Sequence, residues 1–187
     1  MVYESLIAIV ESHLSDLTQT WVDEVKKSTH LNTYQKLSDE ELFNRGNTLF
    51  VNIQNWLING ASLDDAEIFF YNLGFKRFKE NFPLTEIYYA LHLEKKVLWS
   101  FIAWKDNTSR TLEAHDAIEF MTIINNYFDL GDFNLIRGYV DELHTQLSNS
   151  KKYNATELEN LIPSKIKHQE NISKYLFSEG LNIDSIK

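Results

Sequence analysis

The sequence has no cysteine, only two prolines and six glycines, and no long unbroken apolar run among its 187 residues. Without cysteine there are no disulfides, no thiolate metal ligands and no cysteine nucleophile, as suits a reducing compartment. The scarcity of helix-breaking residues predicts a mostly helical chain. No stretch approaches the roughly 20 apolar residues of a membrane span, and Glu4 and Glu11 stand where a signal peptide would be basic. We therefore expect neither a signal peptide nor a membrane-spanning segment.

Positive charge is also scarce. The formal net charge is −9, and residues 1–150 alone carry 12 basic and 22 acidic side chains. An acidic surface field opposes binding to nucleic acid and to anionic membranes, so neither is an expected partner. Apolar residues (43%) and aromatic residues (13%) are plentiful, and they argue for a folded domain with a substantial core.

The segment 82–104, FPLTEIYYALHLEKKVLWSFIAW, predicts the central helix of the fold. Pro83 suits a first helical turn, and Glu86 suits the positive end of the helix dipole. At about 100° per residue one broad face is apolar, comprising Ile87, Ala90, Leu91, Leu98, Phe101 and Ile102, widened by Tyr88 and Trp99. Tyr89, His92 and Lys96 fall opposite. A helix this apolar must be covered by others, yet Glu94 projects onto the middle of the apolar face.

Apolar residues at three-four spacing predict further helices on both sides of this segment. They cover about residues 2–27, 39–58, 62–81, 111–147 and 155–178. The helix at 39–58 has the sharpest start signal, because Ser38 and Glu41 match a capping box. The segment 111–147 is either one long helix or two helices broken near Gly131, and we favour a kinked or interrupted helix. We expect Pro163 to divide the last helix. Gly74 either permits a close helix approach or only weakens its helix.

These elements predict an all-α fold: a single-domain helical bundle with an additional C-terminal helix. The helical domain would comprise residues 1–147. The polar stretch 148–154, SNSKKYN, is typical of a linker. Residues 155–187 would then form a C-terminal helical extension that is too apolar to be a simple polar tail.

No catalytic motif is present. The sequence lacks a His-Glu-x-x-His zinc element and a phosphate-binding glycine loop. A two-iron bundle needs paired Glu-x-x-His elements, whereas this chain offers only Asp141 with His144, which we interpret as an exposed pair. His92 is expected at the surface rather than as a haem ligand, and nothing near His168 forms a kinase core. We predict a non-enzymatic protein with no metal and no cofactor.

Glu94 is the most informative polar residue. Burying an unpaired carboxylate costs roughly several kcal/mol, so Glu94 should find a cation or have a raised pKa. Arg45, Arg77 and Arg137 are available partners, each on a different predicted helix. One interpretation is a structural ion pair or a position at the edge of the face. The other is a polar group lining an internal pocket, for which the ligand-binding candidates are Glu94, Arg77 and Trp99.

Several short runs together resemble a known family. They are Leu37–Leu42 (LSDEEL), Phe82–Leu91 (FPLTEIYYAL), Val97–Trp99 (VLW), Asn126–Asp129 (NYFD) and Gly138-Tyr139. In this order and spacing they resemble the N-terminal domain of RsbR/RsbRD-type RsbT co-antagonist proteins, over about residues 1–147. The resemblance implies a cytoplasmic, non-enzymatic bacterial signal-transduction input domain in stress-response regulation. Such domains are commonly homodimers ahead of an output module, such as a STAS domain or a histidine kinase, and related ones are globin-like without haem.

The sequence departs from this pattern in places. Arg77 stands six residues before Pro83, where globin-coupled sensors carry a proximal histidine, so a haem would lack its axial ligand from that position. Glu94 stands where such domains more often have an apolar residue. The residues after 147 are too few for a STAS or kinase module, which implies either a piece of a longer protein or a free-standing relative that signals by partner binding. The alternative functions are a globin-like small-molecule or haem-binding protein and an enzyme built on a helical bundle.

Overall fold

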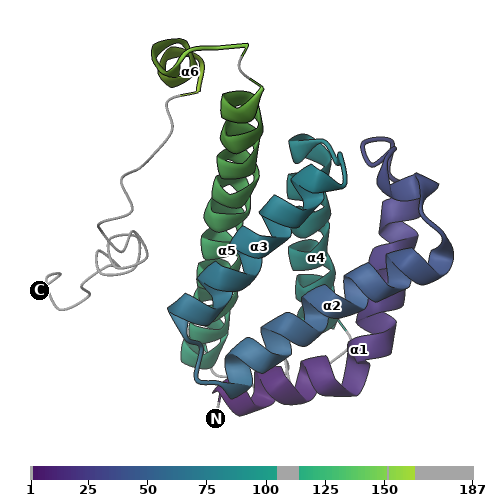
Figure 1. Cartoon of the computed structure of the whole chain (residues 1–187). Helices are drawn as coiled ribbons and strands as arrows, with labels where there is room; N and C mark the ends of the chain where they lie inside the picture. Colours follow the sequence, from purple (N-terminus) through teal and green to yellow (C-terminus); the bar gives the residue numbers. More distant parts are fainter. Residues whose placement is uncertain (1, 105–113, 151, 163–187) are drawn as a thin grey trace, which may run out of the picture. The chain divides into compact units, whose positions relative to one another are not determined.

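The computed structural model describes residues 2–104, 114–150 and 152–162, and this part of the chain is helical without any β-strand (Figure 1). The elements are α1 (Val2–Lys27), the 3-10 helix η1 (Tyr34–Lys36), α2 (Asp39–Ile58), α3 (Leu63–Lys79), α4 (Leu84–Trp104), α5 (Ala114–Asn149) and α6 (Ala155–Leu161). The predicted all-α helical bundle is confirmed. The chain divides into two compact units, Met1–Tyr139 and Val140–Lys187, so that the boundary falls within α5. None of the described helices is both long and apolar enough to cross a bilayer.

The predicted helix boundaries agree closely with the structure. Those of α1 and α2 match at both ends, and α3 and α4 differ from their predicted ranges by one or two residues. The helix α5 runs to Asn149, so the first residues of the predicted linker 148–154 are helical. Pro163 and the longer helical piece expected after it lie outside the described residues.

The interruption expected near Gly131 is wrong, because α5 continues as a helix through this residue. The irregularity lies in α1 instead, at His13, whose φ of −123° and ψ of 15° are not helical. Gly131 has a packing role, since a Cβ there would lie 2.8 Å from the ring of Phe70 in α3. In this long helix the glycine marks a close contact rather than a break.

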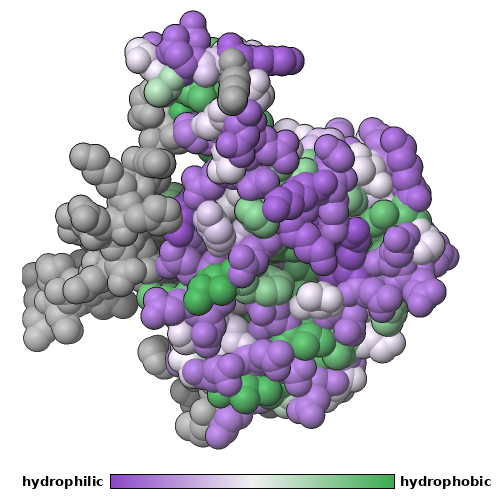
Figure 2. All heavy atoms as spheres, viewed as in Figure 1, coloured by the Kyte–Doolittle hydropathy of each residue, from purple (hydrophilic) through white to green (hydrophobic). Residues whose placement is uncertain are grey.

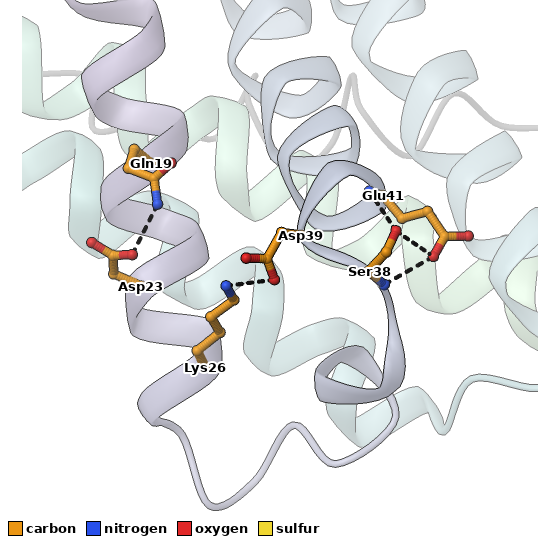
Figure 3. A network of polar contacts seen from close by, with 6 residues as sticks. All are labelled: Gln19, Asp23, Lys26, Ser38, Asp39 and Glu41. Carbon is orange, nitrogen blue, oxygen red and sulfur yellow. Dashed lines mark hydrogen bonds and ion pairs between the residues drawn. The ribbon is translucent and has the colours of Figure 1, made fainter.

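The start of α2 is fixed by the predicted capping box (Figure 3). The Glu41 N–H donates to Ser38 Oγ at 3.2 Å, and the Ser38 N–H donates to Glu41 Oε2 at 3.0 Å. These reciprocal bonds satisfy backbone groups that the first turn of a helix leaves unpaired. Lys26 at the end of α1 pairs with Asp39 in the same turn, with an N···O distance of 2.6 Å. The beginning of α2 is thereby also joined to α1.

The helix α4 is buried among its neighbours, as predicted, and α1, α2 and α3 all contact it. Its predicted inner face is at most 6% exposed at Ile87, Ala90, Leu91, Leu98, Phe101 and Ile102. Trp21 of α1 donates its indole N–H to the Ala90 carbonyl at 3.0 Å, which fixes α1 against α4. Tyr88 was expected to widen the buried face but is 44% exposed, so that detail of the prediction is wrong.

The helices α3 and α5 meet backbone to backbone. Gly74 of α3 faces the carbonyl of Leu135, Gly138 of α5 faces the carbonyl of Tyr71, and a Cβ at either glycine would overlap that oxygen. Only a residue without a side chain permits this approach. Two aromatic pairs flank the contact, Phe70 with Tyr127 and Phe78 with Tyr139, with ring centroids 5.1 and 4.9 Å apart. Of the two interpretations of Gly74, the close helix approach is confirmed.

Candidate functional site

A groove of about 660 Å³ lies between α2 and α3, which are joined by a short turn and diverge from it (Figure 1). Its volume is in the range of small-molecule sites, roughly 300–1,000 Å³. The surface over these two helices is largely hydrophilic with separate hydrophobic patches (Figure 2). The groove is lined from α2 by Glu41, Asn44, Arg45 and Thr48, and from α3 by Asp65, Ile68, Phe69, Asn72, Leu73, Lys76 and Arg77. It therefore combines charged, amide and apolar groups.

Two arginines at the wide end of the groove share a single carboxylate oxygen. Nη1 of Arg45, on α2, and Nη1 of Arg77, on α3, each lie 2.8 Å from Oε2 of Glu80. Burial alone would raise the pKa of Glu80, but the hydrogen bond from Arg45 and the charge of Arg77 outweigh it and hold this pKa below its ordinary value. The carboxylate thus connects the end of α3 to the first half of α2 opposite the turn.

The ring of Phe82 lies against both guanidinium groups. Its centroid is 5.1 Å from Cζ of Arg45 and 5.6 Å from Cζ of Arg77, within the range of cation–π attraction. Tyr34 packs edge-on against the same ring with centroids 4.8 Å apart. Burial raises the pKa of Tyr34, while the charge of Arg77 and a hydrogen bond with it act in the opposite direction. The two cationic groups are therefore held in place by an aromatic support as well as by Glu80.

Arg77 retains unused hydrogen-bonding capacity. It is only 5% exposed, and its Nε has no hydrogen-bond partner within the described part of the chain. Buried N–H groups in native proteins rarely lack an acceptor. Arg45, Leu73 and Arg77 also line a void of about 10 Å³ next to the groove, with room for at most one water molecule. A buried, partly unsatisfied cation therefore borders the groove.

Glu94 lies in the core of the bundle, fully buried. Neither of its carboxyl oxygens has a hydrogen-bond partner among the residues that the structure describes, and burial raises its pKa well above the ordinary value. The three arginines considered as partners are engaged elsewhere: Arg45 and Arg77 with Glu80, and Arg137 with Glu67 at 2.7 Å. Burial therefore favours the neutral acid at this position.

Tyr127 of α5 is a titratable side chain within electrostatic reach of Glu94. Burial raises the pKa of Tyr127 well above its ordinary value, and Glu94 in its ionised form would raise it further. The Tyr127 hydroxyl donates to Oδ1 of Asn52 at 2.7 Å, and its ring packs on Trp56 with centroids 4.7 Å apart. Tyr127 is thus satisfied by α2, and it leaves Glu94 without a hydrogen bond.

The three ligand-binding candidates named from the sequence do not come together in one site. Arg77 lines the groove and the adjoining void, whereas Glu94 and the half-buried Trp99 line neither of them. Sequence reasoning missed Glu80, although Arg77 and Glu80 are three residues apart at the end of α3, where such pairs lie on one face. Arg45 was considered only as a partner of Glu94, because spacing along the sequence does not reveal its contact with Glu80.

Histidine and carboxylate side chains do not gather into a metal site within residues 2–104, 114–150 and 152–162. His92 is exposed, as predicted, and stacks on Tyr89 with ring centroids 6.3 Å apart. His144 is half-buried on α5, where its Nδ1 lies 3.5 Å from the hydroxyl of Ser148. His168 lies outside the described residues.

Comparisons with known proteins identify no relative of this chain. No protein-family model, no curated protein and no solved structure matches it. Membership of the RsbR-type family and the likeness to globins therefore remain predictions.

Proposed function

We propose that this chain is a non-enzymatic bacterial signal-transduction input domain that acts through a second copy of itself and a downstream signalling protein or output module. The motif order shared with RsbR-type input domains supports this proposal from the sequence. The structure adds a helical bundle with an apolar strip left on one of its helices. Because input domains of this kind relay a state change through contacts, the exposed strip is the relevant feature.

The observation that carries the proposal is this apolar strip on α5. We use the name α5 strip for Ile118, Met121 and Ile136, which are 63%, 50% and 38% exposed. At about 100° per residue the three side chains fall on one side of the helix. Ile118 and Met121 are one turn apart, whereas Ile136 lies about 22 Å farther along the axis, beyond Asp129 and Asp132 on the same side. Contiguous exposed apolar surface marks interaction sites, so the adjacent pair Ile118 and Met121 is the apolar centre of the proposed contact and Ile136 is a separate contact point. A second copy that presents the same strip would form a self-complementary, two-fold interface.

Two acidic residues lie along the same side of α5. Asp129 pairs with Lys95 at 3.6 Å, and burial raises the pKa of Asp132 to about 6, with Lys95 opposing and Asp129 adding to the shift. A two-fold interface over the α5 strip would bring these acids near their copies. Since like charges repel and burial disfavours the ionised form, we expect dimers to be tighter below pH 6 than above it.

Light scattering after size-exclusion chromatography tests the proposal. The wild-type chain should elute as a dimer at high protein concentration, and the double variant Ile118→Glu/Ile136→Glu should be a monomer. The matched control is Ile68→Glu, since Ile68 is 61% exposed on α3 and lies outside the α5 strip. A wild-type chain that remains monomeric at the highest concentration would refute the proposal, as would a double variant that still forms dimers.

A further inference from the structure

We propose that the groove between α2 and α3 binds a small organic monoanion, a single carboxylate carried on an apolar body, with Arg45 and Arg77 as its anchor. This site is separate from the α5 strip, and the proposal does not depend on dimerisation. Its occupant is identified by three features of the groove: the two arginines at one end, of which Arg77 keeps an unsatisfied Nε, the acidic residues at the rim, and the apolar wall.

The cationic end calls for an anion. Arg45 and Arg77 share one oxygen of Glu80. Glu41, one turn before Arg45 in α2, also lies within reach of the Arg45 charge. Lys76 also lines the groove, and no ion pair of Lys76 is found in the described part of the chain. Arg77 is buried with its Nε unsatisfied at the same place. Guanidinium groups present several N–H donors in a planar fork that suits a carboxylate, which makes this anchor specific as well as charged.

Two acidic residues at the rim of the groove disfavour a ligand with more than one negative charge. Glu41 and Asp65 also line the groove, in the first turns of α2 and α3. Glu41 is fixed there by hydrogen bonds from the backbone N–H and the hydroxyl of Ser38, each 3.0 Å long. Fixed carboxylates on a chain of net charge −9 repel a polyanion such as a nucleoside triphosphate. A monoanion can reach the arginines with far less repulsion.

The α3 wall accounts for the apolar body. Ile68 is 61% exposed, and Phe69 and Leu73 are half-buried beside it along the groove. Small-molecule sites typically combine such apolar surface with a few polar groups that fix orientation. Asn44 and Thr48 supply polar groups from α2. A flat ring or branched chain that carries one carboxylate would cover the wall while its charge reaches the anchor.

The test is a titration of the full chain with benzoate, monitored by NMR chemical-shift changes or by calorimetry. Two control ligands are benzamide, the uncharged isostere, and inorganic phosphate, an anion without an apolar body. A ligand of this size should bind with a Kd of about 1 mM. Benzamide and phosphate should each bind at least about tenfold more weakly, because each lacks one of the two features. Binding of benzamide or of phosphate as tight as that of benzoate would overturn the assignment, and so would the absence of benzoate binding at about ten times the expected Kd.

Variants place the binding in the groove. Arg45→Gln should weaken benzoate binding about tenfold, whereas Arg137→Gln removes a similar part-buried arginine on α5 and should leave it unchanged. Asn72→Trp provides a second route that keeps both arginines, since Asn72 is exposed on the groove side of α3 and a large ring there should block entry. Unchanged benzoate binding in Asn72→Trp, or equal losses in Arg45→Gln and Arg137→Gln, would refute the proposal. Dimerisation of the same samples is read separately by light scattering, so failure of either proposal can be recognised by itself.

Discussion

The helix α3 has two sides that differ in almost every respect. Toward α5 it approaches backbone to backbone at Gly74 and presents Phe70 and Phe78 to aromatic partners. Toward α2 it is separated by an open groove and presents Asn72, Lys76 and part of Arg77. We call these the α5 side and the groove side of α3. Both sides belong to the same helix, so the difference in their packing comes from the neighbouring helices and not from α3 itself.

The contrast shows how this fold could keep a site open without losing rigidity. Close packing along the α5 side fixes α3, so the groove side need not be filled to hold the helix in position. The cationic residues Lys76, Arg77 and Lys79 stand in the last turn of α3, where the helix dipole favours positive charge. A site wall supported by tight packing on its far side is the arrangement that precise ligand binding requires.

The largest effect is expected from breaking the α5 side. Gly138→Ala should lower the free energy of unfolding by about 2–3 kcal/mol, because the added Cβ overlaps the Tyr71 carbonyl and forces the helices apart. This loss should outweigh the gain of about 1 kcal/mol that alanine brings to a helix interior. Gly74→Ala should act similarly through the Leu135 carbonyl. Urea denaturation measures both.

The control for the glycine variants lies on the groove side of the same helix. Asn72→Ala changes an exposed residue that lines the groove, and it should alter the free energy of unfolding by less than about 0.5 kcal/mol. Equal losses for Gly74→Ala and Asn72→Ala would show that the two sides of α3 are packed alike, which would contradict the comparison.

A second prediction concerns Glu94, the fully buried acid of α4. Glu94→Leu should raise the free energy of unfolding at pH 7 by about 2 kcal/mol, because it removes a carboxyl that burial leaves without a partner. Since the folded pKa of Glu94 lies above the ordinary value of 4.5, the wild type should lose stability as pH rises from there, and the variant should lack this loss. Denaturation curves between pH 5 and pH 8 test both points. A variant less stable than the wild type at pH 7 would show a favourable role for the carboxyl, whereas stabilisation with unchanged ligand binding would exclude the internal-pocket interpretation.

Much of the fold was readable from the sequence because its signals are local. The capping box at Ser38 and Glu41 placed the start of α2, and the apolar period of α4 identified its buried face and the odd position of Glu94. Each of these depends on residues a few positions apart, so spacing alone is sufficient. The predicted burial of Tyr88 was wrong because a tyrosine at the border of an apolar face can point either into the core or into solvent.

The site was less readable because its parts come from distant positions. Arg45 and Glu80 meet across the end of the groove far from the turn that joins the diverging helices α2 and α3, and no local sequence pattern predicts this contact. Gly131 shows the same limit. A glycine within a helical pattern signals either a break or a close contact, and only the position of Phe70 on another helix decides between them.

Substitution of Asp132 on α5 should change the free energy of unfolding less than substitution of Glu94 does. Burial raises its pKa from 3.8 to about 6, so stability should decline as pH rises through that window, and Asp132→Asn should remove the decline. Because Asp132 is only half-buried, the gain above pH 6 should be at most about 1 kcal/mol. Thermal unfolding at pH 4 and pH 7 measures it. An Asn variant with the same pH dependence as the wild type would contradict the expected role of Asp132.

The smallest effect should come from the groove side, and its pH dependence should have the opposite sign. Glu80 has a lowered pKa because Arg45 and Arg77 outweigh the cost of its burial, so its contribution is present above the ordinary value of 4.5 and is lost as pH falls below it. Glu80→Gln should therefore cost roughly 0.5–1 kcal/mol at pH 7, a modest amount for a part-buried ion pair because the glutamine oxygen can still accept from the arginines, and almost nothing at pH 3. A double-mutant cycle with Arg45→Gln separates the pairwise part from other consequences of each change. Acidification would thus weaken the bridge across the groove while relieving two buried acids elsewhere, Glu94 of α4 and Asp132 of α5. A Glu80 variant that lost more stability at pH 3 than at pH 7 would contradict this opposite pH dependence of the groove and the packed core.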